Sequence, residues 1–253
     1  MKKAELKEFL EAKVLQYNTP DFIAEDPISI PHSYAKKEDI EISGFLVSVF
    51  AWGQRKVILK NGFRLMELMD NDPHEFVVSH SKSDLKSVQK FVHRTFNGED
   101  CTFFLQRLQQ IYLKEGGLEN VFASAYKGNM QEGLSLFKSK FFDGSHPHRT
   151  EKHLPDPMKG ASAKRINMYL RWMVRKDNAG VDFGIWKKIK PAALYCPLDV
   201  HSGNVARKLT LLKRTQNDWE AVEELNAVLK SFDPKDPVKY DFALFGLGVN
   251  QEL

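Results

Sequence analysis

The sequence predicts an all-α fold. Apolar residues recur every three or four positions through most of the 253 residues, which is the period of an amphipathic helix. Strand-like alternation is scarce, and the chain contains neither an internal repeat nor a low-complexity tract. Its length allows one large domain or two small lobes, with enough chain to bury a sizeable core.

The first half of the chain predicts six helices separated by turns rich in Gly, Pro, Asn and Asp. They are expected over residues 2–17, 39–52, 57–69, a short stretch beginning at Pro73, 84–96 and 101–114. The segment 42–52 is apolar enough for a buried helix, although its β-branched residues would allow a strand. Residues 23–32 contain Pro27 and Pro31 and are expected to form a surface connection.

The second half continues the helical pattern. Helices are expected over residues 118–126, 130–142, 161–176, 199–213, 218–231 and 237–247. Between them, residues 143–157 carry prolines and basic side chains and are expected to form a loop. The histidines of this loop, His146, His148 and His153, have a spacing that fits no standard zinc site, so no metal is expected.

Composition excludes several classes of protein. The chain has only two cysteines, Cys101 and Cys196, which excludes a four-cysteine iron–sulfur cluster or zinc ribbon and argues against a disulfide framework. The formal net charge of +4 is compatible with a polyanionic partner and is also ordinary for an enzyme. The first residues lack the apolar core of a signal peptide, and no apolar run could cross a bilayer. A cytoplasmic protein is expected.

The stretch from Lys159 to Leu209 carries the candidate chemistry. A turn of small residues leads into a helix, where free backbone N–H groups can hold an anion such as phosphate. Lys164 lies in the first turn of that helix and Asp199 follows a later turn marked by Pro197. An amine, a carboxylate and a phosphate cradle suit chemistry on a nucleic-acid backbone. Lys164 could equally be a surface cation, and Asp199 could cap the helix that follows it.

Three segments resemble the helix-hairpin-helix DNA glycosylase superfamily in the expected chain order. Residues 160–165 resemble the second half of its hairpin, where a Gly-x-Gly turn precedes a catalytic lysine. Residues 198–201, with 204–209 after them, are similar to its Val-Asp-Thr-His-Val stretch and the Arg pairs downstream. Residues 46–54 resemble the helix and corner that carry a Gln beside the flipped base. The likeness is strongest to the archaeal type of 8-oxoguanine glycosylase and to a related uncharacterised bacterial family that shares the ending 242–248.

The chain departs from the superfamily's pattern in three respects. Ser162 replaces the second glycine of the hairpin. Lys164 and Asp199 are 35 positions apart (199 − 164), which is wider than in endonuclease III-like members, and residues 177–197 resemble an insertion that the archaeal type shares. The cluster cysteines of some members are absent.

The resemblance implies a two-lobed helix-hairpin-helix fold with an interlobe cleft. The range 1–253 would form one glycosylase-like domain, with lobes at approximately 40–160 and 161–253 and the N-terminal helix packed on the second lobe. The implied activity is that of a bifunctional DNA N-glycosylase and AP lyase, a hydrolase of base excision repair that removes an oxidised purine such as 8-oxoguanine. The alternative is a non-catalytic helix-hairpin-helix protein that binds nucleic acid.

Carried over by residue, the resemblance makes Lys164 the nucleophile and Asp199 the carboxylate that stabilises the developing positive charge. The residues implied in DNA binding are Gln54, Gly160, Ser162, Arg165 and His201; from its residue type alone, His201 could also be structural. No cofactor is implied, apart from the monovalent cation that some members bind at the hairpin. The implied partner is double-stranded DNA with a damaged base, bound by a monomer. Trp52, Trp172, Phe183 and Trp186 are candidate pocket aromatics.

Overall fold

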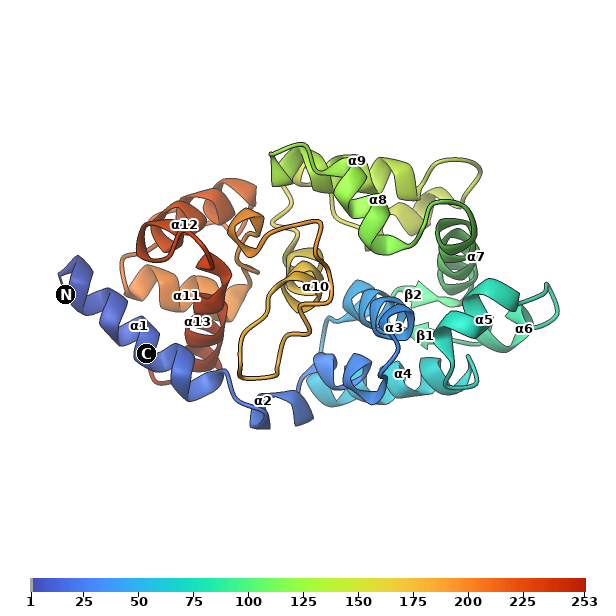
Figure 1. The fold of residues 1–253 in the computed structure, drawn as a ribbon, viewed down its shortest axis with the longest axis horizontal. Helices are drawn as coiled ribbons and strands as arrows, with labels where there is room; N and C mark the ends of the chain where they lie inside the picture. The colour runs from blue at the N-terminus through green and yellow to red at the C-terminus, as the bar shows by residue number, and fades with distance from the viewer. Residues whose placement is uncertain (1) are drawn as a thin grey trace. The chain divides into compact units, whose positions relative to one another are not determined.

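The computed structural model describes residues 2–253 and is predominantly helical, as Figure 1 shows. The all-α class predicted from the sequence is therefore confirmed. Met1, the first residue of the predicted range 1–253, lies outside the described residues. No helix in the described part of the chain combines the length and the apolar character that crossing a membrane requires.

The chain divides into two compact units. The C-terminal unit consists of the residues through Phe22, Gly128–Glu132 and Pro155–Leu253, and the central unit consists of Ile23–Lys127 and Gly133–Leu154. The last continuous stretch of the C-terminal unit begins at Pro155, and the unit also includes the N-terminal helix. Two helices cross a boundary between the units, α2 (Asp21–Ala24) and α9 (Met130–Phe141).

The central unit is built around the buried helix α3. Its other elements are helices of varied length and one small hairpin: η1 (Pro27–Ser29), η2 (Pro31–Ser33), α3 (Lys37–Phe50), α4 (Arg55–Glu67), α5 (Pro73–Ser79), α6 (Leu85–Val88), β1 (Val92–His93), β2 (Phe96–Asn97), α7 (Gly98–Lys114), α8 (Leu118–Ala125) and η3 (His148–His153). Every residue of α3 from Asp39 to Phe50 is buried. The Phe45 ring lies 6.1 Å from Phe104 and 5.5 Å from Phe141, so closely packed aromatic rings fill this core.

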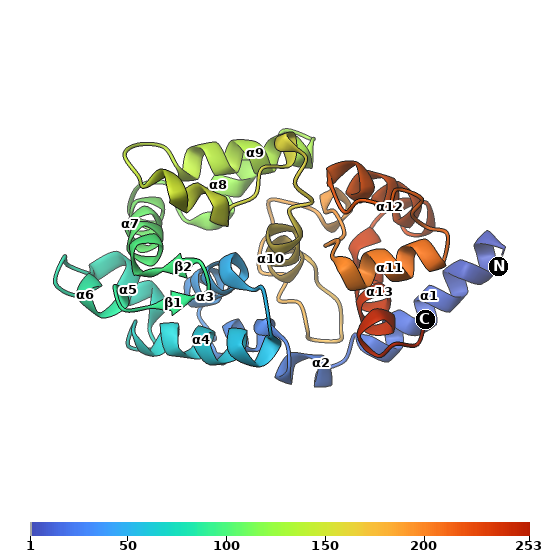
Figure 2. The same cartoon turned by 180° about the vertical axis from the view of Figure 1, so that it is seen from behind.

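The C-terminal unit packs its last helix against its first. Its elements are α1 (Lys3–Tyr17), η4 (Pro157–Lys159), α10 (Lys164–Val174), η5 (Pro191–Ala193), α11 (Val200–Lys208), α12 (Trp219–Phe232), η6 (Pro237–Lys239) and α13 (Tyr240–Val249). Helix α13 is apolar on most sides and lies between α1 and α11 (Figures 1 and 2). Gly246 allows this packing, because a Cβ there would lie 2.3 Å from the Tyr17 ring.

Two of the predicted elements are wrong. The helix expected over residues 84–96 ends at Val88 and is followed by the hairpin of β1 and β2, which pairs His93 with Phe96. Arg94, at the hairpin turn, has φ +56°, which a right-handed helix cannot contain. The surface connection expected over 23–32 is partly core, since Ile28 and Ile30 are fully buried.

Two predicted helices are shorter than expected, because single residues adopt the left-handed region. The helix expected over 161–176 begins at Lys164, since Ala163 has φ 52° and ψ 32°. The helix expected over 199–213 ends at Lys208, and Thr210 beyond it has φ 57°. A left-handed residue cannot continue a right-handed helix, so these residues set the ends.

Candidate functional site

The turn before α10 is shaped by hydrogen bonds within residues 156–160. Asp156 caps η4, its Oδ1 accepting from the Met158 amide at 3.1 Å. The Gly160 amide donates to the Pro157 carbonyl at 2.9 Å. Gly160 has φ +86° and ψ 0°, a conformation that favours glycine, and no atom lies within 4 Å of the position of an added Cβ. The tip of the turn is therefore open and exposed.

This turn is fastened to the start of α12. The Trp219 amide donates to the Gly160 carbonyl at 3.0 Å, and Ala161 forms an isolated bridge with Asp218. Asp218 also caps α12, its Oδ1 accepting from the Ala221 amide at 3.1 Å. The hydrogen-bonded Arg214 guanidinium lowers the pKa of the Asp218 carboxyl. The cap of one helix thus fixes the turn that leads into another.

Lys164 and Asp199 lie together in the C-terminal unit, although 35 positions separate them in the sequence. The Lys164 Nζ is 3.7 Å from the Asp199 Oδ2, and the two side chains are 28% and 23% exposed. The Lys164 Nζ also lies 3.8 Å from the Met168 Sδ. Both charged groups are thus partly shielded and partly open to a ligand.

The two carboxylate oxygens of Asp199 have different partners. Oδ1 accepts from the Ser202 amide at 2.9 Å and from the Ser202 hydroxyl at 3.1 Å, which caps α11. The Asp199 amide donates to the Ser202 hydroxyl at 2.9 Å and completes the capping box. Oδ2 faces Lys164. The capping interpretation of Asp199 is therefore correct, and it leaves the second oxygen available for chemistry.

A buried charge network involves Arg171 of α10, the helix that carries Lys164, and Arg175 at the C-cap of that helix. Arg171 donates from Nε to Asp182 Oδ1 at 3.2 Å and also pairs with Asp241. Arg175 donates from NH1 to Asp182 Oδ2 at 3.1 Å and from Nε to Asp236 Oδ2 at 2.9 Å. Residues Arg171, Arg175, Asp182 and Asp241 are all buried. Because each buried charge has an opposite partner, its desolvation is offset.

Asp241 connects this network electrostatically to the Lys164–Asp199 pair. Burial raises the pKa of the Asp241 carboxyl to about 6, while the charges of Arg171 and Lys164 lower it and that of Asp199 raises it. The buried thiol of Cys196 lies 3.8 Å from the Asp241 Oδ1, and burial raises its pKa well above the ordinary value. Cys196 is therefore an uncharged thiol at neutral pH.

Three other predicted residues, Ser162, Arg165 and His201, also belong to the C-terminal unit. Ser162 is half-buried, and its carbonyl accepts from the Asn167 side chain at 3.3 Å. Arg165 is half-buried, and burial lowers its pKa to about 10. His201 is exposed in the first turn of α11, beside a hollow of about 310 Å³ that Arg207 also lines.

Gln54 belongs to the central unit and not to the unit that holds the other predicted residues. It is exposed and stands at the N-terminus of α4. Of the four candidate aromatics, Trp172 and Trp186 are buried core residues, and Phe183 is half-buried. Trp52 is 36% exposed, two residues before Gln54.

The basic segment 146–153 fastens η3 to α7. The Arg149 Nη1 donates to the Asp100 Oδ2 at 2.7 Å, and the buried His153 Nε2 lies 3.1 Å from the same oxygen. The Thr150 hydroxyl donates to Asp100 Oδ1 at 2.7 Å. His148 contacts Glu151 with its Nδ1 at 2.9 Å. These contacts give most of the segment a structural role. No group of His, Cys, Asp and Glu within residues 2–253 is arranged to hold a metal ion.

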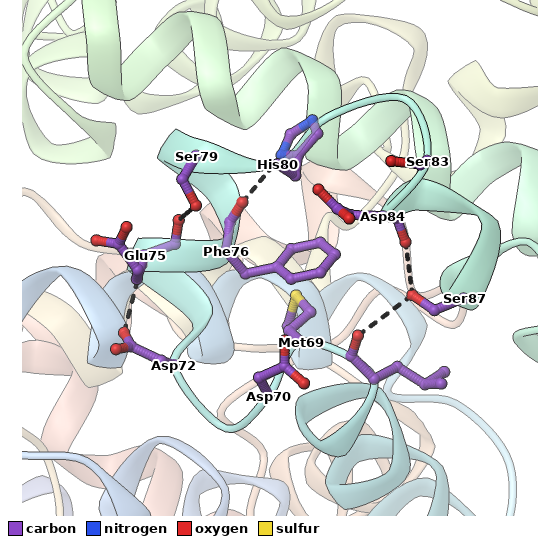
Figure 3. A pocket seen from close by; sticks show the side chains of 11 residues that line it. Met69, Asp70, Asp72, Glu75, Phe76, Ser79, His80, Ser83, Asp84 and Ser87 are labelled. Carbon is purple, nitrogen blue, oxygen red and sulfur yellow. Dashed lines mark hydrogen bonds between the residues drawn. The ribbon is translucent and has the colours of Figure 1, made fainter.

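A separate hollow of about 360 Å³ in the central unit contains none of the predicted residues (Figure 3). It lies between the end of α4, α5 and α6. Its polar lining consists of acidic and serine side chains with His80, and its apolar lining is Leu68, Met69 and Phe76. These polar groups close local turns: the Asp72 Oδ1 accepts from the Glu75 amide at 3.3 Å, and the Ser87 hydroxyl donates to the Asp84 carbonyl at 2.7 Å. Its acidic lining does not suit a polyanion.

Sequence reasoning missed the buried network. The signal was present, because Arg171 on α10 and Arg175 at its C-cap stand four residues apart in a mostly apolar segment. Charged residues are rarely buried without partners, so this spacing could have prompted a search for acidic partners. Nothing in the local pattern identifies Asp182 and Asp241 as those partners.

Comparisons with known proteins give one relationship. None of the curated proteins and none of the solved structures matches the chain. A family model matches residues 26–250, which is nearly the whole chain and includes every predicted site residue. The chain belongs to the family described as Protein of unknown function (DUF2400).

Proposed function

We propose that this protein is a bifunctional DNA N-glycosylase and AP lyase that removes an oxidised purine, with 8-oxoguanine as the substrate, through a Schiff base on Lys164. In this proposal the chain adopts a helix-hairpin-helix glycosylase fold, and the segment from η4 to the start of α10 is the hairpin. The observation that carries the proposal is the 3.7 Å separation between the Lys164 Nζ and the Asp199 Oδ2.

The proposed reaction begins with transfer of a proton from the Lys164 Nζ to the Asp199 Oδ2, after which the amine attacks the sugar C1′. The C1′–N bond to the damaged base breaks, and the base leaves with the bonding pair and takes up a proton. Asp199 Oδ2 is suited to accept the proton that the amine gives up and to stabilise positive charge on the sugar, because its partner oxygen is held by Ser202.

The lyase step follows from the amine adduct. The ring C1′–O4′ bond breaks, O4′ is protonated, and an iminium ion joins C1′ to Lys164. Loss of a 2′ proton then expels the 3′ phosphate, which nicks the strand. Water hydrolyses the iminium and releases the lysine. No metal or redox cofactor takes part in these steps.

The hairpin supports the proposal by its geometry. Gly160 is exposed and left-handed, and the first amides of α10 have no carbonyl partner within the helix. A phosphate, with or without a monovalent cation, is the ligand that such a turn suits. The Trp219–Gly160 hydrogen bond keeps the turn in place without occupying its tip.

Borohydride trapping tests the enzyme proposal. Duplex DNA containing 8-oxoguanine, incubated with the protein and borohydride, should give a covalent adduct that Lys164→Gln does not form. Lys235→Gln is the matched control, since Lys235 is an exposed lysine of the same unit that lies outside the proposed hairpin. Its adduct should form at the wild-type rate.

Two results would contradict different parts of the proposal. An adduct of undiminished yield from Lys164→Gln would exclude Lys164 as the nucleophile while leaving an enzyme. Failure of the wild type to trap with 8-oxoguanine, an abasic site or any other lesion would exclude the enzyme. If the wild type trapped with no lesion but still bound DNA with the salt dependence of counterion release, the alternative of a non-catalytic nucleic-acid-binding protein would replace the enzyme proposal.

A further inference from the structure

The corner between α3 and α4 holds the most exposed of the four tryptophans. Trp52 is 36% exposed, whereas Trp172, Trp186 and Trp219 are at most 2% exposed. The same corner holds Gly53, whose φ of +103° turns the chain sharply between the two helices.

The β1–β2 hairpin places a cation over this indole. The Arg94 Cζ lies 5.0 Å from the centre of the Trp52 ring. A Cβ on Gly53 would lie 2.8 Å from the Arg94 Nη1, a contact that a small shift of this flexible side chain would relieve, so the φ of +103° is what favours glycine here. We call Trp52, Gly53 and Arg94 the Trp52 corner.

A buried histidine holds the corner in shape. The His93 Nε2 lies 3.1 Å from the Trp52 carbonyl, and its Nδ1 lies 2.9 Å from the Asn61 Nδ2. The tautomer with its proton on Nε2 satisfies both bonds. His93 is 1% exposed, and its ring lies 5.1 Å from the core residue Phe50. The hairpin is therefore anchored, and the corner is organised before any ligand binds.

Helix α4 carries a line of cations away from this corner. Lys56, Lys60 and Arg64 are exposed at positions i, i+4 and i+8, so they follow one side of the helix at steps of about 6 Å. Within residues 2–253, no carboxylate lies within ion-pair distance of these three or of Arg94. We call Lys56, Lys60 and Arg64 the α4 stripe.

We propose that the Trp52 corner is a stacking platform for an unpaired nucleobase, and that the α4 stripe binds the phosphates that flank this base. An exposed indole offers a π face to any base, and a planar guanidinium stacks in the same way. Cations without acidic partners complement a phosphate backbone, whereas a protein partner would need matching carboxylates. This inference rests on the proposed function only in taking nucleic acid as the partner, and it adds that the bound nucleic acid contains an unpaired base.

Tryptophan fluorescence gives a selective test, because the other three indoles are buried. A single-stranded oligodeoxythymidylate should quench the intrinsic fluorescence of the full-length protein. An oligomer of the same length made of tetrahydrofuran abasic units carries the same phosphates without bases, and it should bind more weakly and without quenching. Trp52→Phe should abolish the quenching, and Trp52→Ala should weaken binding of the thymidylate, measured by anisotropy, by roughly 5- to 150-fold.

The stripe is tested by salt dependence. The triple variant Lys56→Gln, Lys60→Gln, Arg64→Gln should reduce the slope of log affinity against log salt by about 2, the value for three phosphates of a single strand. Gln106→Asn, an exposed uncharged change on α7 of the same unit, should leave the slope unchanged.

The outcomes separate this proposal from the enzyme proposal. Quenching that Trp52→Phe retains, or equal binding of both oligomers, would overturn the platform even if borohydride trapping succeeds. Binding to neither oligomer would also overturn it and would favour a protein partner. The oligodeoxythymidylate should quench the fluorescence of Lys164→Gln as it quenches that of the wild type. Loss of catalysis and loss of base stacking are therefore measured separately. Unchanged unfolding midpoints of the Trp52 variants exclude a folding defect.

Discussion

Substitution of Asp199 separates its capping role from its proposed chemical role. Its Oδ1 caps α11 through Ser202, and its Oδ2 lies 3.7 Å from the Lys164 Nζ. Asn caps a helix as well as Asp does, whereas Ala cannot accept the amide hydrogen bond. Asp199→Asn therefore keeps the cap and removes the negative charge, while Asp199→Ala removes both.

The structure sets the magnitudes of this prediction. Loss of the cap in Asp199→Ala costs about 1 kcal/mol of unfolding free energy, within a range of roughly 0.5–2 kcal/mol. The partly exposed ion pair with Lys164 adds about 0–1 kcal/mol, and it is lost in both variants. Asp199→Ala should thus be about 1 kcal/mol less stable than Asp199→Asn. Both should lose nicking activity on 8-oxoguanine duplex by roughly 10²- to 10⁴-fold.

Urea unfolding and single-turnover nicking measure the two effects. Asp72→Ala is a matched control, since Asp72 caps α5 in the central unit through the Glu75 amide at 3.3 Å. It should cost a similar stability and leave nicking unchanged. Equal destabilisation by Asp199→Asn and Asp199→Ala would refute the capping argument, and full nicking by Asp199→Asn would refute the role of the charge.

Three further substitutions test the turn and the buried network. Gly160→Ala should cost roughly 1–2 kcal/mol of unfolding free energy in urea and should weaken DNA binding measured by anisotropy. The control Gly144→Ala, also at positive φ with open space around the added Cβ, should leave DNA binding unchanged. Equal DNA binding by both variants would contradict a phosphate cradle at Gly160. Asp182→Ala leaves two buried arginines, Arg171 and Arg175, without their shared partner and should lower the unfolding free energy by about 3–5 kcal/mol. A loss below about 1 kcal/mol in urea unfolding would contradict this role of Asp182. Burial raises the folded-state pKa of Asp241 to about 6, above an unfolded value of about 3.9, so its stabilising contribution is complete below pH ~4 and is lost as the pH rises through 6. The unfolding free energy of the wild type minus that of Asp241→Asn should therefore fall between about pH 4 and 6, by up to about 1.4 kcal/mol per pH unit. A difference that rises with pH would contradict the raised pKa of Asp241.

Helical periodicity was sufficient for most of the fold, because each long helix buries one face and its sequence carries that pattern. The 84–96 region failed for a definite reason. Phe91 and Phe96 both pack on Phe50, at 5.5 and 5.9 Å, and a tight turn at Arg94 allows this. That packing depends on a helix some forty residues away, and a local window does not contain it.

For the site, the sequence by itself determined the parts that are local. The turn at Gly160, the position of Lys164 at a helix start and the capping role of Asp199 all follow from residue types and short spacings. Only the tertiary structure decided that the amine and the carboxylate meet, since the path of the 35 intervening positions is set by packing. It also decided which charges are buried together and which tryptophan is exposed, because burial depends on contacts between distant segments and not on the identity of the residue.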